Sequence, residues 1–353
     1  MSTRTVSPRA GVKVGFIGCG GNAGGHMRRV SQTAGASIVG VCDVSAAAAE
    51  RAAAATGAAP YSDYRAVLDR PDLDAVYVSV PVFAHGEIEL AVAERGLPMF
   101  VEKPVAIDLA TAREVLAAVR RSGVGTCVGY QLRYCGSADV ARELLALPDA
   151  GPVGLATGTY WCGTGRAQPG HWRTRMARSG GQLVEQATHT VDMMRFLVGE
   201  VSEVAAFYGQ RILSAAHSDC PDSHAVALRF ANGAVGTVGA TWAGDPTDWS
   251  RANLVDLAYG DRRLHWGVSG VDVPGDRGAG AAPAAGARTL TRADRSIDAV
   301  FLQAVASGAW DEIRSDYADA VTTLAVTLAA NASAAAGGTP VGVAPAAGED
   351  SRN

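Results

Sequence analysis

Three side chains that could move a proton lie together in the segment 180–192, GGQLVEQATHTVD. On a helix, Glu185 would share a face with His189, and Asp192 would reach the same imidazole from the next turn. A histidine with its ordinary pKa of about 6.5 can exchange a proton with a hydroxyl group, and a carboxylate beside it orients the ring. We therefore predict a general acid–base histidine, although a histidine held by a carboxylate for structure alone would have the same pattern.

A second charged pair, Glu102 and Lys103, follows the short apolar run 99–101 and precedes Pro104. The carboxyl end of a parallel strand is where open α/β sheets bind ligands. Lys103 at such an edge would stabilise negative charge on a reacting oxygen, or act as the base if burial lowered its pKa. A solvated surface pair is the alternative, and the sequence leaves open whether His189 or Lys103 is the base.

A glycine-rich turn follows the apolar run 12–17 and has the sequence GCGGNA, which matches the pattern G-x-G-x-x-A. In that pattern Gly18 permits a tight turn, Gly20 lets the backbone approach a pyrophosphate, and Ala23 lets the next helix pack closely on the sheet. An ordinary glycine turn is the alternative, but the expected strand before it and the expected helix after it favour dinucleotide binding.

The choice of dinucleotide depends on Asp43, which ends the next apolar run at about the 20-residue distance from Gly20 that the pattern requires. A carboxylate at this place accepts hydrogen bonds from ribose hydroxyls and repels a 2′-phosphate. No arginine follows in residues 44–46 to neutralise that phosphate. We predict NAD rather than NADP as the cofactor, and the alternative is that Asp43 only caps the next helix.

Metal binding is not expected, although two segments have suitable side chains. The spacing of Glu185 and His189 suits metal ligands, and the segment HSDC (217–220) with His224 carries several more. The six cysteines are scattered and form no C-x-x-C pair. Hydride chemistry with a nicotinamide accounts for Glu185 and His189 without a metal.

The elements that would position these residues change in kind along the chain. In the first third, short apolar runs alternate with helical patterns, which predicts βαβ units and a parallel sheet. The later part has β-branched runs and a hairpin signal at Asn232-Gly233, which predicts a mostly antiparallel or mixed sheet. The expected strands are 12–17, 37–42, 75–80, 99–101, 125–129, 154–161, 203–208, 225–230, 234–242 and 253–259, and the expected helices are 45–56, 83–95, 109–121, 183–197, 299–306 and 316–335.

The composition excludes several classes of protein. A chain of 353 residues with 48% hydrophobic residues exceeds what one core usually serves, so two domains are expected. The net charge of −4 offers no basic excess for nucleic-acid phosphates. No apolar run approaches the roughly 18 residues that span a bilayer, and the first residues lack a signal region. We expect a cytoplasmic protein that binds neither nucleic acid nor membranes.

Together these motifs resemble the Gfo/Idh/MocA oxidoreductase family, which includes glucose–fructose oxidoreductase and inositol dehydrogenase. The resemblance spans nearly the whole chain and rests on six segments. They are GFIGCGGNAGGH (15–26), residues 74–104 with the EKP motif at their end, VGYQLRY (128–134), SGGQLVEQATHTVD (179–192), ALRFANGAVGTVGATW (227–242) and residues 314–341.

The resemblance implies an α/β fold in which a Rossmann dinucleotide-binding domain precedes an α/β domain with an open, mostly antiparallel sheet. We expect the Rossmann NAD-binding domain over 1–127 and a substrate-binding and oligomerisation domain over 128–343, whose late helices pack back on the first domain. A flexible tail is expected over 344–353 and a flexible loop over 275–286. The open sheet face of the family commonly builds a homodimer or homotetramer.

The resemblance also implies roles for single residues. Lys103, His189 and Glu185 are the expected catalytic residues. Aromatic rings stack on sugar faces and arginine binds hydroxyls or anions, so the candidate substrate residues are Tyr130, Arg133, Tyr160, Trp161, Trp172, Arg173 and Asp192. The alternative for several of them is a place in the core or at an interface. The expected cofactor contacts are Gly18, Gly20, Gly21, Asn22, Ala23, Asp43, Ser79, Pro81, His85, Glu102, Lys103 and Gln131.

Two positions depart from the family pattern. Glu185 stands where many members have aspartate, so its carboxylate reaches about one methylene further, and Gln131 stands where asparagine is common. The implied activity is hydride transfer between NAD and a ring carbinol or ketone of a sugar, glycoside or cyclitol. An NAD-dependent glycosidase is an alternative within the family, and so is a non-catalytic NAD-binding regulator, which the retained Lys103, Glu185 and His189 disfavour.

Overall fold

The computed structural model describes residues 11–163, 169–245, 252–273 and 288–344, so the loop expected at 275–286 and the tail beyond residue 344 lie outside the described residues. The chain divides into two compact units. Unit 1 holds residues 1–129 and 295–321, and unit 2 holds residues 130–294 and 322–353. Because unit 1 is made of two separate stretches of chain, unit 2 interrupts it in the sequence.

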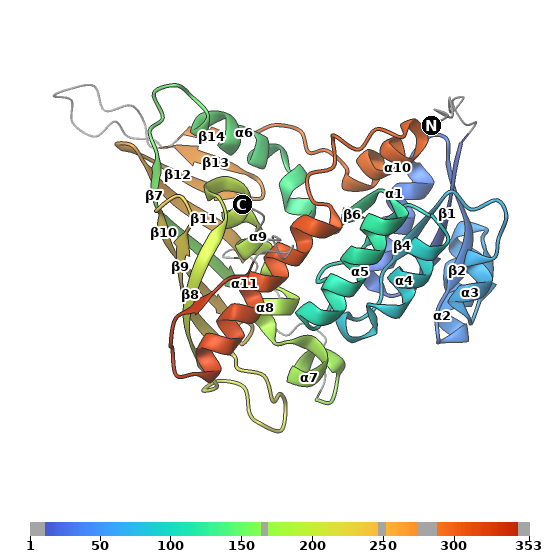
Figure 1. The fold of residues 1–353 in the computed structure, drawn as a ribbon, viewed down its shortest axis with the longest axis horizontal. Coiled ribbons are helices and arrows are strands. Elements are labelled where there is room, and N and C mark those ends of the chain that lie inside the picture. Colours follow the sequence, from blue (N-terminus) through green and yellow to red (C-terminus); the bar gives the residue numbers. More distant parts are fainter. Residues whose placement is uncertain (1–10, 164–168, 246–251, 274–287, 345–353) are drawn as a thin grey trace. The chain divides into compact units, whose positions relative to one another are not determined.

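Unit 1 is built on a six-stranded parallel sheet in the order β3-β2-β1-β4-β5-β6 (Figure 1). In such a sheet the strand order reverses beside β1, and ligands bind at the carboxyl ends of the strands there. The elements are β1 (Val12–Ile17), α1 (Gly21–Gln32), β2 (Ala36–Cys42), α2 (Ala46–Thr56), β3 (Ala59–Tyr61), α3 (Tyr64–Leu68), β4 (Ala75–Val78), η1 (Val82–Ala84), α4 (Glu87–Glu94), β5 (Met99–Val101), α5 (Leu109–Ser122), β6 (Thr126–Val128) and α10 (Ile297–Ser307).

Buried aromatic rings fill the centre of unit 1. Tyr77 of β4 stacks between Phe16 of β1 at 4.5 Å and Phe100 of β5 at 4.9 Å, measured between ring centroids. Phe301 of α10 meets Tyr77 edge-on at 5.3 Å. Burying each ring stabilises the fold by roughly 1.5–3 kcal/mol, so this stack ties α10 to a sheet that lies far from it in the sequence.

Unit 2 is built on a nine-stranded sheet in the order β14-β13-β12-β11-β7-β10-β9-β8-β15. Strands β7 and β10 are parallel and the other neighbours are antiparallel. The elements are η2 (Gln131–Tyr134), α6 (Gly136–Leu145), β7 (Val153–Trp161), η3 (Trp172–Thr174), α7 (Met176–Ser179), α8 (Gln182–Glu185), α9 (Thr188–Val198), β8 (Val201–Gly209), β9 (Ser223–Phe230), β10 (Val235–Thr241), β11 (Ala252–Tyr259), β12 (Arg262–Gly267), β13 (Gly270–Val273), β14 (Arg288–Leu290), α11 (Tyr317–Ala335), which begins in unit 1, and β15 (Val341–Gly342).

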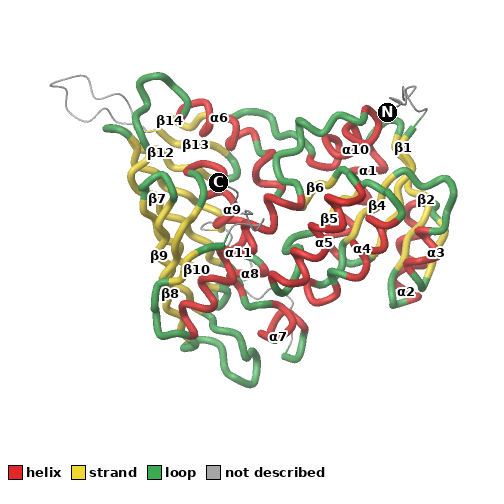
Figure 2. Tube along the Cα trace, viewed as in Figure 1, coloured by secondary structure: helices red, strands yellow, loops and turns green. Residues whose placement is uncertain are grey.

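Helices cover one face of this sheet and leave the other face exposed (Figure 2). Helix α9 packs so closely on β7 that a Cβ atom at Gly158 would lie 2.5 Å from Thr190. The later part of α11 is joined to β8 by a hydrogen bond from the Ala206 amide to Ser333 Oγ, at 2.9 Å. From its second residue on, β9 alternates between buried and exposed side chains, which is the pattern of a sheet covered on one side.

The structure confirms the predicted fold class. The Asn232-Gly233 hairpin is present, because β9 and β10 pair in antiparallel register and Gly233 has a φ of +92°. Within the described ranges, no helix is both long enough and apolar enough to cross a bilayer.

Two predicted helices are wrong in their continuity. The helix expected at 183–197 is two helices, α8 and α9, because Gln186 leaves helical geometry with φ −123° and ψ −55°. The amides of Gln186 and Ala187 both donate to the carbonyl of Gln182, which closes α8 before α9 begins. The helix expected at 83–95 is likewise divided into η1 and α4 at Gly86, whose φ is +118°.

Candidate active site

The glycine turn of unit 1 has the geometry of a phosphate cradle. Gly18 has a φ of +94°, and a Cβ atom there would lie 2.1 Å from the Ser79 carbonyl oxygen, so only glycine fits. A Cβ atom at Gly20 or Gly21 would meet nothing within 4 Å, so space is open above the first turn of α1. Because the free amides of a helix N-terminus attract negative charge, the residues present fit the pyrophosphate of a dinucleotide.

Asp43 lies at the end of β2, beside this turn. Its carboxylate accepts hydrogen bonds from the Cys19 amide at 2.9 Å and from the Ser45 amide at 2.8 Å. These two bonds hold the carboxylate against the glycine turn, and each of its oxygens keeps capacity to accept a further bond. The arrangement fits the recognition of ribose hydroxyls, and it does not depend on capping α2, whose N-cap residue is Ser45.

The segment after β4 carries Ser79, Pro81 and His85 at the same carboxyl edge of the sheet. The Ser79 amide donates to the Ile17 carbonyl at 2.8 Å, which fixes the segment to β1 next to the glycine turn. His85 is buried and its Nδ1 lies 2.5 Å from Glu89 Oε1, while Glu89 Oε2 accepts from the Gly86 amide. The hydrogen bond from the Gly86 amide orients Glu89, and Glu89 in turn orients the His85 ring.

Glu102 and Lys103 follow β5 at this same edge. The Glu102 amide donates to the Val78 carbonyl at 2.8 Å, and the Glu102 side chain is buried. Its Oε1 lies 2.6 Å from Nε2 of His26, a residue of α1 for which the sequence predicted no role. The cofactor residues predicted in unit 1 are thus brought to one edge of one sheet.

In unit 2, Glu185 and Arg173 bind each other. Arg173 Nε donates to Glu185 Oε1 at 3.0 Å, and the Glu185 side chain is only 4% exposed. The Arg173 guanidinium also lies 5.2 Å from the centroid of the Trp172 ring. A residue predicted to be catalytic and two predicted to bind substrate therefore form one cluster at η3 and α8.

His189 lies in the first turn of α9, beside Tyr130. The two rings meet edge-on with centroids 5.9 Å apart, and Tyr130 Oη lies 3.0 Å from Thr188 Oγ1. Because one helix ends at Glu185 and the next begins at Thr188, the shared helix face that the spacing of Glu185 and His189 predicted does not exist. The two side chains are instead held by separate short helices.

Asp192 forms a buried ion pair with Arg133. Arg133 donates to both carboxylate oxygens, at 2.8 Å and 2.7 Å, and Thr323 Oγ1 donates to one of them at 3.0 Å. Asp192 is fully buried and Arg133 is 4% exposed. Both residues were predicted to bind substrate, and either could do so only if this bidentate pair opened.

The remaining predicted substrate residues lie apart. Tyr160 is buried and Trp161 is 45% exposed, because successive residues of β7 point to opposite faces of the sheet. They cannot both line one site. Gln131 is exposed at the start of η2.

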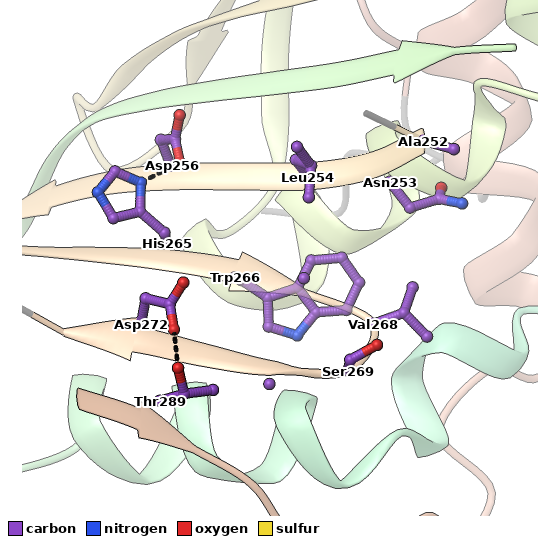
Figure 3. A pocket seen from close by; sticks show the side chains of 12 residues that line it. Ala252, Asn253, Leu254, Asp256, His265, Trp266, Val268, Ser269, Asp272 and Thr289 are labelled. Carbon is purple, nitrogen blue, oxygen red and sulfur yellow. Dashed lines mark hydrogen bonds and ion pairs between the residues drawn. The ribbon is translucent and has the colours of Figure 1, made fainter. Parts of the chain in front are cut away.

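A hollow of about 750 Å³ lies over β11, β12 and β13 of unit 2 and contains none of the predicted site residues (Figure 3). His265 Nδ1 lies 2.5 Å from Asp256, and Thr289 donates to Asp272 at 2.5 Å. In the part of the chain that the structure describes, no group of three or more His, Cys, Asp or Glu side chains could hold a metal ion.

His26 is the main site residue that sequence reasoning missed. It lies on α1 at helical spacing from Ala23 and Val30, both of which are fully buried. That spacing places a histidine on the apolar face of the helix, and a buried polar group needs hydrogen-bond partners. The helical spacing therefore indicated that His26 is buried, but the carboxylates that bind His26 cannot be identified from spacing.

Comparison with known proteins assigns the chain to a family. The family model described as "Oxidoreductase family, NAD-binding Rossmann fold" matches residues 12–130, and that of the GFO/IDH/MocA C-terminal domain matches residues 139–255. The chain is 30% identical over 238 residues to scyllo-inositol 2-dehydrogenase (NAD(+)) of Bacillus subtilis strain 168, which covers 65% of this chain and 67% of the relative.

Two further similarities agree. Levoglucosan dehydrogenase of Pseudarthrobacter phenanthrenivorans is 31% identical over 204 residues, covering 51% of this chain and 52% of the relative, so the match spans about half of that relative's length. A solved structure of levoglucosan dehydrogenase in complex with NADH has a TM-score of 0.80 at 25% identity, covering 95% of this chain and 100% of that one. The chain therefore belongs to the Gfo/Idh/MocA family of oxidoreductases, and its first domain is an NAD-binding Rossmann domain.

Proposed function

We propose that the protein is an NAD-dependent dehydrogenase that transfers a hydride between NAD and a ring carbinol or ketone of a sugar, glycoside or cyclitol. The observation that carries this proposal is the common edge of the unit 1 sheet, where the open glycine turn, Asp43 and Lys103 follow β1, β2 and β5. Relatives named as inositol and levoglucosan dehydrogenases support a polyhydroxylated ring as the substrate class.

In the oxidation direction, His189 takes the proton of the reacting hydroxyl group, because imidazole is a side chain that can exchange a proton near neutral pH. Lys103 hydrogen-bonds the same oxygen and stabilises its developing negative charge. Arg173 and Glu185 bind neighbouring hydroxyl groups, for which their ion pair offers donors and an acceptor. When bound, NAD supplies the hydride acceptor, and the residues described above hold and orient it.

The test is a panel of sugars, glycosides and cyclitols, in which NADH formation is followed by absorbance with NAD and with NADP as cofactor. We expect turnover of at least one ring polyol with NAD. Release of a sugar from a glycoside without net NADH would instead indicate the glycosidase. Tight NAD binding without turnover of any member would indicate a regulator and refute the dehydrogenase.

We also propose that the protein forms a homodimer or homotetramer through the exposed face of the unit 2 sheet and works in the cytoplasm. Large apolar side chains gather on that face: Leu155, Trp161, Phe207 and Val235 are each at least 45% exposed. Apolar patches on a soluble protein mark interaction surfaces. All six cysteines are free thiols, as is usual in a reducing compartment.

The oligomer is tested by light scattering coupled to gel filtration. Phe207→Glu should give monomers, because it buries a charge at the interface. Leu147→Glu, at an apolar side chain that is 45% exposed outside the strands, is the control and should leave the assembly intact. A wild-type monomer at micromolar concentration would refute this proposal.

A further inference from the structure

A histidine with a carboxylate on each ring nitrogen is buried inside unit 1. His26 Nε2 lies 2.6 Å from Glu102 Oε1, and His26 Nδ1 lies 2.6 Å from Asp298 Oδ1. His26 is 5% exposed, Glu102 7% and Asp298 fully buried. One side chain thus joins α1, the end of β5 and α10.

The two carboxylates favour the protonated ring. A neutral imidazole has one donor and one acceptor nitrogen, so one of the two carboxylates would face a lone pair. Only an imidazolium donates to both. Burial alone would lower the pKa of His26, but the hydrogen bonds to Asp298 and Glu102 outweigh burial and raise it to about 9.

Three other side chains face the ring. Arg29, on the same helix, donates to the second oxygen of Asp298, and its Nη2 atom lies 3.0 Å from His26 Nδ1. The cluster therefore holds two side chains that can be cations, His26 and Arg29, and two carboxylates. Burial raises the pKa of Tyr77 on β4 well above its ordinary value, so its phenol is neutral beside the ring. Phe100 of β5 lies 4.7 Å away and adds no charge.

Glu102 is held on its other side by the backbone. A Cβ atom at Gly129 would lie 3.1 Å from Glu102 Oε2, so the carboxylate sits directly against this glycine. With the Glu102 amide bonded to Val78, both the backbone and the side chain of Glu102 are fixed. Lys103 is the next residue in the chain.

We propose that His26 is a positioning residue: as an imidazolium it holds the Glu102 carboxylate and thereby sets the position of the Lys103 ammonium. It is not a catalytic residue, because it acts on the reacting oxygen only through Glu102 and Lys103. His26 also lies on α1, whose first turn forms the phosphate cradle. The His26 side chain therefore links the helix that binds the cofactor phosphates to the segment that carries Lys103. The proposal rests on the dehydrogenase function proposed above.

The chain offers an unusually clean probe, because it contains only two lysines, Lys13 and Lys103. Reductive methylation with ¹³C-formaldehyde keeps both charges and gives one NMR signal for each lysine. Lys13 is half-exposed and paired with Asp72, so it is an internal reference. In His26→Gln we expect the chemical shift of the Lys103 signal to move while that of Lys13 stays unchanged.

The matched control is Arg29→Gln, which removes a cation that contacts Asp298 and His26 and leaves the contact between His26 and Glu102 in place. It should leave the Lys103 signal unchanged. If His26→Gln does not fold, Glu102→Gln makes the same test, because it keeps the side chain's shape and removes the carboxylate that His26 holds. A Lys103 signal unmoved in every folded variant of His26 or Glu102, with NAD binding retained, would overturn the proposal.

Kinetics give the second readout. In His26→Gln, kcat per NAD-binding site should fall roughly 10- to 100-fold, as for a misplaced reacting group, with KM values within a few-fold. Equal losses in Arg29→Gln would indicate a merely structural cluster. The NMR signal needs no substrate, so a failure to find turnover would refute the proposed function and leave this test standing.

Discussion

The buried imidazolium of His26 should make the stability of the protein depend on pH in the alkaline range. The pKa of about 9 in the folded protein exceeds the 6.5 of an unperturbed histidine, a difference that corresponds to about 3 kcal/mol of stability. The pKa is raised on folding, so this contribution is complete below about pH 6.5 and is lost as the pH rises through 9. The lowered pKa of Asp298 reflects the same pair and is not added to it.

The assay is urea unfolding of wild type and His26→Gln between pH 6 and pH 10. We expect the difference in unfolding free energy between the two proteins to shrink by about 3 kcal/mol over this range, since groups common to both cancel. Hydrogen exchange of α1 amides would show that unit 1 is the part measured. The control is His265→Gln, at a half-exposed histidine of β12, which should give no such trend. A wild-type curve parallel to that of His26→Gln would refute the buried imidazolium.

Three further outcomes are expected. Asp43→Ala should reduce the preference for NAD over NADP in kcat/KM, and an unchanged preference would place selectivity elsewhere. His189→Ala should lower kcat by about 10²- to 10⁴-fold with NAD binding intact, and Lys103→Ala by at least as much, whereas an unchanged pH–rate profile in His189→Ala would make Lys103 the base. Arg133→Met should cost about 3–5 kcal/mol in urea unfolding because it strands a buried carboxylate, while Arg229→Met at an exposed pair should cost less than about 1 kcal/mol.

The sheet of unit 1 could be predicted because the residues that indicate it lie close together in the sequence. The apolar run before Gly18 is β1 itself, and the glycine turn and Asp43 directly follow β1 and β2, so all three lie within a short stretch of sequence. Side chains that follow parallel strands lie at the same edge of the sheet, whatever the conformation of the segments that connect the strands. The roles predicted for Asp43, Lys103 and His189 follow from this logic and from the family, and they stay predictions until the variants are measured.

The predictions that were wrong concern features that depend on packing between residues far apart in the sequence. Helical periodicity alone could not show that Gln186 ends α8, since the break depends on how its amide and the next one share a carbonyl. Likewise, Arg133 and Asp192 each looked suited to bind a substrate, yet 59 residues apart in sequence they satisfy each other. The charges of Arg133 and Asp192 meet only because η2 packs near α9, and sequence spacing does not indicate such a contact.

The division of unit 1 into two stretches of chain sets an order on its completion during synthesis. Asp298 and Phe301 leave the ribosome only after residues 130–294, so until then the aromatic stack has an open side and His26 has a single carboxylate. Closing a loop of that length through an unfolded chain costs roughly 4–5 kcal/mol of entropy. The two ends of the intervening stretch meet within unit 2, where the Gly136 amide donates to Asp294 at 2.9 Å. Once unit 2 has folded, its two ends are already held close together, so most of the loop-closure entropy has been lost before α10 forms. The packing of α10 on the sheet then completes unit 1.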